Sequence, residues 1–319
     1  MSFAIYVYIM RSGNITLSKS MVRALIAVIN GSNCLEALQK DMKVSKSWMA
    51  RIVNSLNGQG FVTKEHKGRV VTIEVATTPH AIAFKDMYLE KPYRKYPEIF
   101  SGRNLDVLQA IVSEEKSSET IGEMLHVQAR IVRPRIRFLA NNGLITKAGK
   151  RYIVARKQKE VIPFLQSLRN FSKKKGIVLW QFGNTALLKA NKLSDISGLL
   201  TGFNKYADFG VEVNTAAFVY CTGVENLSVE DIFVHSLFEI NDQRTFGLAT
   251  TLFAKQRLYL KKQKILHIAE KFDKLGGAND IANAYDMIKN NKIKAKSLPP
   301  LADVKEIRQL FDLYGVKNV

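Results

Sequence analysis

Apolar residues recur at helical spacing through the first part of the chain, and glycines interrupt the pattern. Residues 18–29, 34–42 and 45–57 each carry apolar side chains three or four positions apart, which predicts three amphipathic helices. Gly58 and Gly60 end the third segment, and two short runs rich in β-formers follow on either side of a turn. Three helices followed by a hairpin is the order of a winged helix-turn-helix domain.

The same order of elements occurs a second time. Helices are predicted over residues 105–112, 118–125 and 127–141, and a hairpin turns at 148–150. An offset of 83 positions pairs apolar residues of the two third helices and the glycines that follow them: Val44 with Val127, Trp48 with Ile131, Val53 with Ile136, Leu56 with Leu139 and Gly60 with Gly143. We therefore expect a tandem repeat in which the paired apolar side chains are core residues.

The rest of the chain follows a different pattern. A helix and a proline-containing linker are predicted over 77–101, and a basic connector over 156–175. Strands at 176–182, 186–190, 211–214 and 217–220 precede a series of helices that begins at Ser228. The expected fold is therefore α+β: two winged helix-turn-helix domains (residues 1–76 and 102–155), then a mixed α+β domain with a helical tail (residues 176–319).

The chain is strongly basic, with 48 Lys and Arg against 28 Asp and Glu and a formal charge of +20. This balance makes a polyanion the first partner to consider, either nucleic acid or an anionic membrane surface. The apolar run at 3–10 is too short to span a bilayer, so we interpret it as a buried strand or helix start. Cys34 and Cys221 form no CxxC pair, which excludes a zinc ribbon and fits a reducing cytoplasm. We expect a cytoplasmic protein without a membrane partner.

Residues 127–139, VQARIVRPRIRFL, contain four arginines and no acidic residue. On a helix, Arg130, Arg133 and Arg137 fall within an arc of roughly 60°. The core-facing side is expected to hold Val127, Ile131 and Phe138, widened by Val132, Ile136 and Leu139. Ten Lys or Arg and no Asp or Glu lie between Met124 and Lys159, whereas an ordinary solvated face mixes both signs. We therefore expect this helix to bind nucleic acid, since Arg can bind guanine or phosphate.

Pro134 lies in the middle of this predicted helix, and Arg135 falls on its apolar side if the helix is regular. A proline in a helix interior costs roughly 3 kcal/mol when the lost hydrogen bond is unrelieved. A break or kink at Pro134 would change the phase of the helix and explain both features. In that arrangement the arginines would hold the DNA backbone rather than read bases.

The candidate DNA-binding residues come from the third helix and the hairpin, or wing, of each predicted domain. In the first domain they are Lys46, Ser47, Ala50, Arg51, Asn54, Lys64, Lys67 and Arg69; in the second they are Arg130, Arg133, Arg135, Arg137, Lys147, Lys150 and Arg151. Small and amide side chains can approach base edges closely, and basic wings commonly contact phosphate or the minor groove. For the first third helix, a merely polar surface is an equally good interpretation.

Familiar catalytic motifs do not occur in the sequence, which has no P-loop, HExxH, GxSxG or paired-carboxylate magnesium motif. His235 has Asp231 and Glu239 four positions away on either side, a spacing that permits a metal or acid–base site. A packing histidine tethered by a carboxylate is the favoured interpretation, and Cys221 is expected to be a small buried residue. We expect neither enzymatic activity nor a metal or other cofactor.

The paired domains resemble those of archaeal MarR/ArsR-type transcriptional regulators. The C-terminal segments GIVLWQFGNTALLKA, LLTGFNKYADFG and SVEDIFVHSLFEINDQRTFGLATTLFAK resemble a region found in a family of such regulators. They are also distantly similar to abortive-infection antitoxins, which pair with nucleotidyltransferase toxins. The resemblance covers most of the chain from about Leu17 and implies DNA binding without enzymatic activity. Pro134 departs from the ordinary winged-helix pattern.

Two functions follow as hypotheses. In the first, the protein is a sequence-dependent transcriptional regulator that binds double-stranded DNA through its winged domains. The C-terminal domain would then sense a signal, pair with a second copy or dock a partner protein. In the alternative, the winged domains are protein-interaction modules, and the chain binds and neutralises a nucleotidyltransferase toxin. A third hypothesis, a nucleic-acid enzyme, has no motif to support it.

Overall fold

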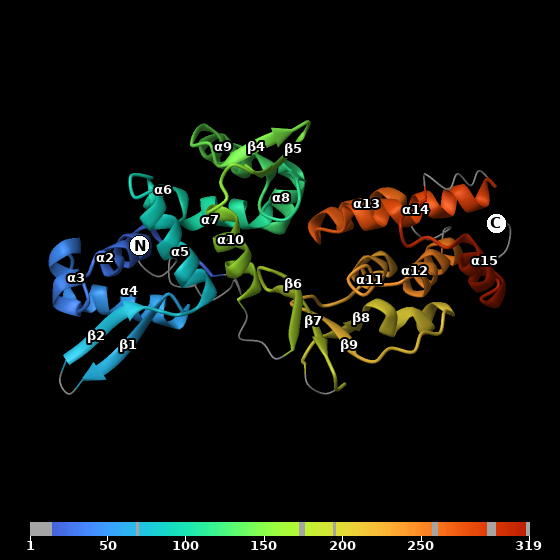
Figure 1. Ribbon diagram of the computed structural model, residues 1–319, viewed down its shortest axis with the longest axis horizontal. Helices are drawn as coiled ribbons and strands as arrows, with labels where there is room; N and C mark the ends of the chain where they lie inside the picture. Colours follow the sequence, from blue (N-terminus) through green and yellow to red (C-terminus); the bar gives the residue numbers. More distant parts are fainter. Residues whose placement is uncertain are drawn as a thin grey trace. The chain divides into compact units, whose positions relative to one another are not determined.

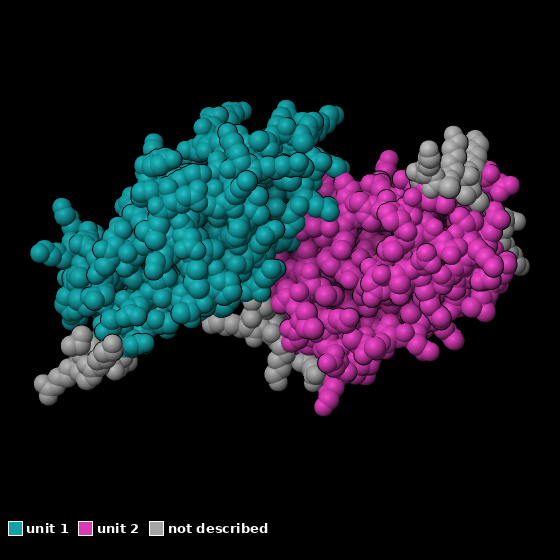
Figure 2. Space-filling model, viewed as in Figure 1, with its two compact units in different colours: residues 1–172 teal, residues 173–319 magenta. Residues whose placement is uncertain are grey.

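The computed structural model describes residues 15–67, 70–171, 176–193, 196–256, 261–291 and 298–316. The chain forms two compact units, unit 1 (Met1–Ser172) and unit 2 (Lys173–Val319), coloured teal and magenta in Figure 2. Both units combine helices with small antiparallel sheets, which confirms the expected α+β class. The apolar run at 3–10 lies outside the described residues, as does Arg69.

Unit 1 begins with three helices and a hairpin, here called the first repeat (residues 18–76; Figure 1). Its elements are α2 (Lys19–Ile29), α3 (Leu35–Met42), α4 (Lys46–Gly58), β1 (Val62–Lys67) and β2 (Val70–Val75). Ser18 and Ser45 begin α2 and α4, since each hydroxyl accepts a hydrogen bond from a backbone N–H three residues later. The three helices pack against one another around Leu25, Leu38 and Val53, which are fully buried.

The second repeat (residues 101–155) has the same order of elements with one additional short strand. It contains α7 (Gly102–Ala110), β3 (Lys116–Ser117), α8 (Ser118–Met124), α9 (Ala129–Asn141), β4 (Ile145–Ala148) and β5 (Arg151–Val154). Strand β5 lies between β3 and β4 in a three-stranded antiparallel sheet. The bounds of α4 and α9 differ by 83 residues at both ends, as the sequence offset predicts.

The turns around the third helix also match between the repeats. Lys43 and His126, 83 positions apart, both have φ of 53° and link the second helix to the third. The N–H of Val127 donates to the Gly122 carbonyl at 2.8 Å, while the equivalent bond of the first repeat, to Gln39, measures 3.4 Å. A Cβ on Gly122 would lie 2.7 Å from the Val127 carbonyl oxygen, so this tighter turn requires glycine.

One expected pair of core residues is not in the core. Trp48 and Ile131 are 47% and 46% exposed, whereas their neighbours Met49 and Val132 are buried. At about 100° per residue, Trp48 and Ile131 lie at the edge of the buried arc of their helices rather than within it. The hydrophobic match between the repeats is therefore correct, but at this position it describes an exposed side chain.

The segments predicted as linker and connector form the junction between the two repeats. Helix α5 (Pro79–Glu90) packs on α10 (Val161–Asn170), and the short α6 (Tyr96–Ile99) lies between them in sequence. The ring of Phe84 contacts the rings of Phe164 and Tyr96 edge-on, with centroids 5.3 and 5.7 Å apart. Pro163 fits the first turn of α10, where backbone N–H groups have no helical partner.

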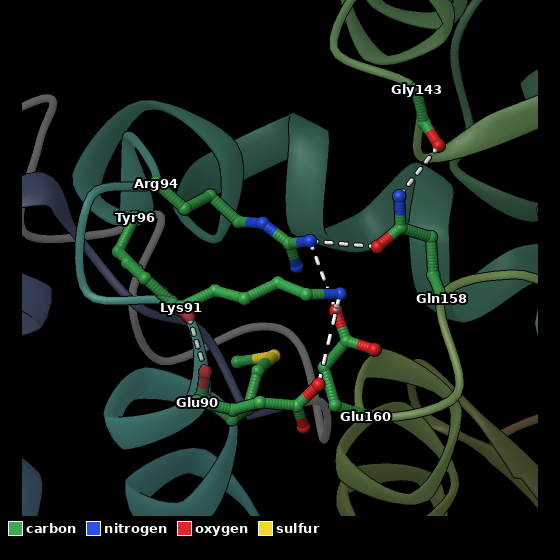
Figure 3. A network of polar contacts seen from close by, with 8 residues as sticks. Glu90, Lys91, Arg94, Tyr96, Gly143, Gln158 and Glu160 are labelled. Carbon is green, nitrogen blue, oxygen red and sulfur yellow. Dashed lines mark hydrogen bonds and ion pairs between the residues drawn. The ribbon is translucent and has the colours of Figure 1, made fainter.

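A polar network joins the same junction to the end of α9 (Figure 3). The Glu160 carboxylate accepts hydrogen bonds from Lys91 at 2.7 Å and from Arg94 at 2.9 Å. Arg94 also donates to the side chain of Gln158 at 2.7 Å, and the Gln158 amide donates to the Gly143 carbonyl at 2.9 Å. The segment after α5 is thereby connected to the glycine that follows α9.

Unit 2 contains a four-stranded antiparallel sheet followed by helices. The sheet order is β6 (Ile177–Phe182), β7 (Thr185–Ala190), β9 (Phe218–Thr222) and β8 (Leu199–Thr201), with the 3-10 helix η1 (Gly202–Phe209) after β8. The helices are α11 (Val229–Ser236), α12 (Gln243–Lys255), α13 (Lys262–Lys271), α14 (Leu275–Lys289) and α15 (Val304–Leu313). Among the described residues, no helix has the length and apolar character needed to span a membrane.

The strand predicted at 211–214 is wrong. These residues pair with no neighbouring strand; instead, the Glu212 carbonyl accepts a hydrogen bond from the Tyr314 hydroxyl at 2.7 Å. The β8 strand was not predicted, because three residues are too few to show an alternating pattern.

Candidate nucleic-acid interface

Helix α9 presents a basic face to solvent. It runs without interruption from Ala129 to Asn141, so the break expected at Pro134 does not occur. Its buried side is formed by Val132, Ile136 and Leu139, and Pro134 lies on the opposite, exposed side. A proline in that position leaves the unpaired carbonyl of the preceding turn accessible to water, which reduces its cost.

All four arginines of α9 are exposed. Arg130, Arg133 and Arg137 lie on the side away from the core, as their spacing predicts. Arg135 was expected on the apolar side, but that side is narrower than predicted and leaves Arg135 in solvent. The equivalent residue of the first repeat, Ile52, is buried. Arg130, Arg135 and Arg137 have no ion-pair partner among the described residues.

Arg133 forms an ion pair with Glu119 of the preceding helix, at 2.7 Å. This bond, followed by backbone hydrogen bonds at the start of α8, holds the pKa of Glu119 below its usual value. The tract without acids is therefore acid-free along the chain but not in space. An equivalent pair occurs in the first repeat, where Lys46 of α4 contacts Glu36 of α3 at 2.8 Å. Glu36 and Glu119 are 83 positions apart, so each third helix has one cation held by the second helix.

Replacing Glu119 with glutamine tests the effect of this pair on the basic face. We expect the Glu119→Gln variant to bind duplex DNA about fivefold more tightly, because unit charges about 4 Å apart in water interact by roughly 1 kcal/mol. Its free energy of unfolding should change little, since exposed ion pairs contribute roughly 0–1 kcal/mol. Affinity is measured by fluorescence anisotropy, with Glu225→Gln in unit 2 as the matched control. Equal effects of the two variants would contradict a local role for Glu119.

The candidate residues of α4 form a more mixed surface. Lys46, Ser47, Arg51 and Asn54 are exposed and Ala50 is partly exposed. Lys64 of β1 donates a hydrogen bond to the side-chain oxygen of Asn54. Of the cations in this set, Lys46 and Lys64 thus have internal partners, whereas Arg51 has none among the described residues. The first repeat therefore carries less unpaired charge on its third helix than the second.

The hairpin of the second repeat adds further positive charge. Lys147 on β4 and Lys150 in the turn are exposed, and Arg151 at the start of β5 is partly exposed. Gly149 has φ of 60° in this turn, a conformation that favours glycine. In the first hairpin, the Lys67 side chain and Arg69 lie outside the described residues.

The charge of the chain is concentrated in unit 1. Its 172 residues hold 27 Lys and Arg against 13 Asp and Glu, a formal charge of +14, which leaves +6 for unit 2. Most of the positive field therefore belongs to the unit that contains both third helices.

Unit 2 contains the buried histidine noted in the sequence, but its tether differs from the expected one. The Nδ1 atom of His235 is 2.8 Å from the hydroxyl of Thr201, while Asp231 caps α11 by bonding Ser228. Glu239 accepts a hydrogen bond from the Phe203 N–H at 3.0 Å. The expected carboxylate tether is therefore wrong. In the described part of the chain, no group of three or more His, Cys, Asp or Glu is placed to hold a metal ion.

Burial shifts the pKa values of both ionisable groups in this cluster. It lowers the pKa of His235 to about 4, against the opposite effect of the Asp231 charge, so the ring is neutral near pH 7. It raises the pKa of Glu239 to about 7, against the hydrogen bond from Phe203. The Glu239 carboxyl also lies where a Cβ on Gly202 would be, 2.2 Å from its Oε2 atom.

We expect the Glu239→Gln variant to change how the stability of unit 2 depends on pH. Between about pH 4.3 and 7 the folded protein binds the Glu239 proton more tightly than the unfolded chain, so this group's contribution falls as pH rises. His235 acts in the opposite direction between about pH 4 and 6.5. Relative to wild type, the variant should therefore gain stability as pH rises from 5 to 8. Urea denaturation followed by Trp180 fluorescence in a Trp48→Phe background measures the difference; a pH-independent difference would contradict it.

Comparison with known proteins gives no family assignment. No protein-family model matches the chain, and no curated protein is significantly similar to it.

Proposed function

We propose that the protein binds double-stranded DNA through two winged helix-turn-helix units and regulates transcription. In this proposal each repeat of unit 1 is one winged unit, with α4 and α9 as the helices that enter the major groove. The hairpins β1–β2 and β4–β5 are the wings. The order of elements and the tight turns before α4 and α9 support this interpretation.

The observation that carries the proposal is the basic face of α9. Three arginines without an ion-pair partner among the described residues share one short helix with a fourth, and two exposed lysines of the following hairpin belong to the same repeat. Such a concentration of cations repels itself, which favours a polyanionic ligand. Guanidinium groups bind both phosphate oxygens and the O6 and N7 atoms of guanine.

The test is a titration of labelled duplex DNA with the full-length protein, followed by fluorescence anisotropy at several salt concentrations. We expect log Kobs to fall linearly with log salt, by about 0.9 for each phosphate neutralised. Competition with unrelated duplexes then measures sequence dependence. A protein that fails to bind any duplex at about 0.05 M salt would overturn the proposal. If that protein instead copurified with a nucleotidyltransferase, the antitoxin-like alternative would be supported.

A further inference from the structure

Two large apolar side chains occupy equivalent exposed positions on the two third helices. Trp48 is the third residue of α4 and Ile131 is the third residue of α9, 83 positions later. They are exposed to almost the same extent, 47% and 46%. Single exposed apolar residues are common on protein surfaces and need no explanation. The recurrence of one at the same helical position in both repeats is harder to attribute to chance.

The neighbours of these side chains are suited to a DNA groove. Ile131 follows Arg130 directly, and Pro134 lies one turn later on the exposed side of α9. Trp48 follows Ser47 directly and precedes Arg51 by one turn, and both of these residues are exposed. The first turns of a recognition helix are the part that approaches base edges in helix-turn-helix complexes.

Among the groups in the major groove, one is apolar. The 5-methyl group of thymine lies at the edge of each A·T pair, and apolar side chains contact it. We propose that Trp48 and Ile131 contact thymine methyl groups, so that each repeat favours sites with A·T pairs beside the bases or phosphates bound by its polar residues. This inference rests on the proposed DNA binding and adds the base class that the third helices recognise.

The experiment uses uracil, which lacks only the 5-methyl group. Duplexes that bind the full-length protein are selected from a random pool, and each selected site is then prepared with thymine or with deoxyuridine. For wild type we expect uracil to weaken binding about fourfold for each methyl group contacted. The Ile131→Ala variant should lose the response at one set of thymines and the Trp48→Ala variant at another.

Ile82→Ala is the matched control, because Ile82 lies on α5 of the same unit and is 45% exposed. This variant should respond to uracil as wild type does. All three substitutions remove exposed side chains, so folding is expected to be preserved. If wild type binds thymine and uracil duplexes equally, or if Ile131→Ala and Ile82→Ala respond alike, the methyl contact is wrong although DNA binding stands. If wild type binds no duplex, the proposed function and this inference both fail.

Discussion

Replacing Arg130 and Arg137 with alanine is expected to weaken binding of duplex DNA at least tenfold at about 0.1 M salt. Both side chains are exposed on α9, away from its buried side, and neither has an ion-pair partner among the described residues. Each phosphate contact contributes about 0.9 to the salt slope, so two contacts amount to on the order of 50-fold between 0.1 and 1 M salt. The slope itself should become shallower by about two.

The control removes the same amount of charge from unit 2. Lys289 and Lys305 are exposed and have no ion-pair partner among the described residues, so the Lys289→Ala, Lys305→Ala variant should bind almost as wild type does. Adding Arg133→Ala to the arginine variant should have a smaller further effect, because that side chain is already paired with Glu119. Equal losses in the two double variants would mean that net charge, rather than α9, determines affinity.

The Glu160→Gln variant is expected to have the largest effect on stability, a loss of about 3–5 kcal/mol from unit 1. The side chains of Glu160 and Arg94 are only 6% and 11% exposed, and Glu160 also bonds Lys91. Neutralising the carboxylate leaves the guanidinium buried without a counter-charge, and such a charge is costly in a poorly solvated site. Urea denaturation of the full-length protein measures the loss.

Two further variants separate the buried charge from other causes. Combining Glu160→Gln with Arg94→Met removes both charges and should restore much of the lost stability. Glu90→Gln removes an exposed carboxylate 3.8 Å from Lys91 and should change stability by less than about 1 kcal/mol. A double variant as unstable as Glu160→Gln alone would show that lost packing, not charge, is responsible.

The same network predicts sensitivity to acid. Burial acts to raise the pKa of Glu160, but hydrogen bonds and charges from Lys91 and Arg94 outweigh it and hold the pKa below its usual value. The contribution of Glu160 is therefore complete above about pH 4.3, the unfolded pKa, and is lost as pH falls through the lower folded value.

The sequence predicted most helices of both repeats, because their apolar residues recur at clear helical spacing. It also placed α9 and its exposed arginines correctly. What it could not show was the width of the buried arc: Trp48 and Ile131 belong to the apolar pattern, but neighbouring helices do not cover them. Periodicity identifies a side of a helix, whereas the extent of its burial depends on tertiary packing.

Interactions between distant segments were the second source of error. The Arg133–Glu119 pair joins two helices, and a count of charges along the chain does not include it. The Thr201–His235 and Phe203–Glu239 bonds bring together two segments more than 30 residues apart, whereas the sequence suggested partners within one helix. A helical spacing of four residues permits a contact but does not establish it.

The packing of α5 on α10 has a consequence for any attempt to dissect the protein. The ring of His80, which follows the first hairpin, contacts Phe61 of the first repeat and Phe171 at the end of unit 1. A fragment that stops after the first hairpin would expose the apolar surfaces that these aromatic groups cover, and a fragment that starts at Ser101 would lose Lys91 and Arg94 as partners for Glu160. Residues 15–171 are therefore the smallest part of the described N-terminal region that keeps both repeats with their shared interior intact.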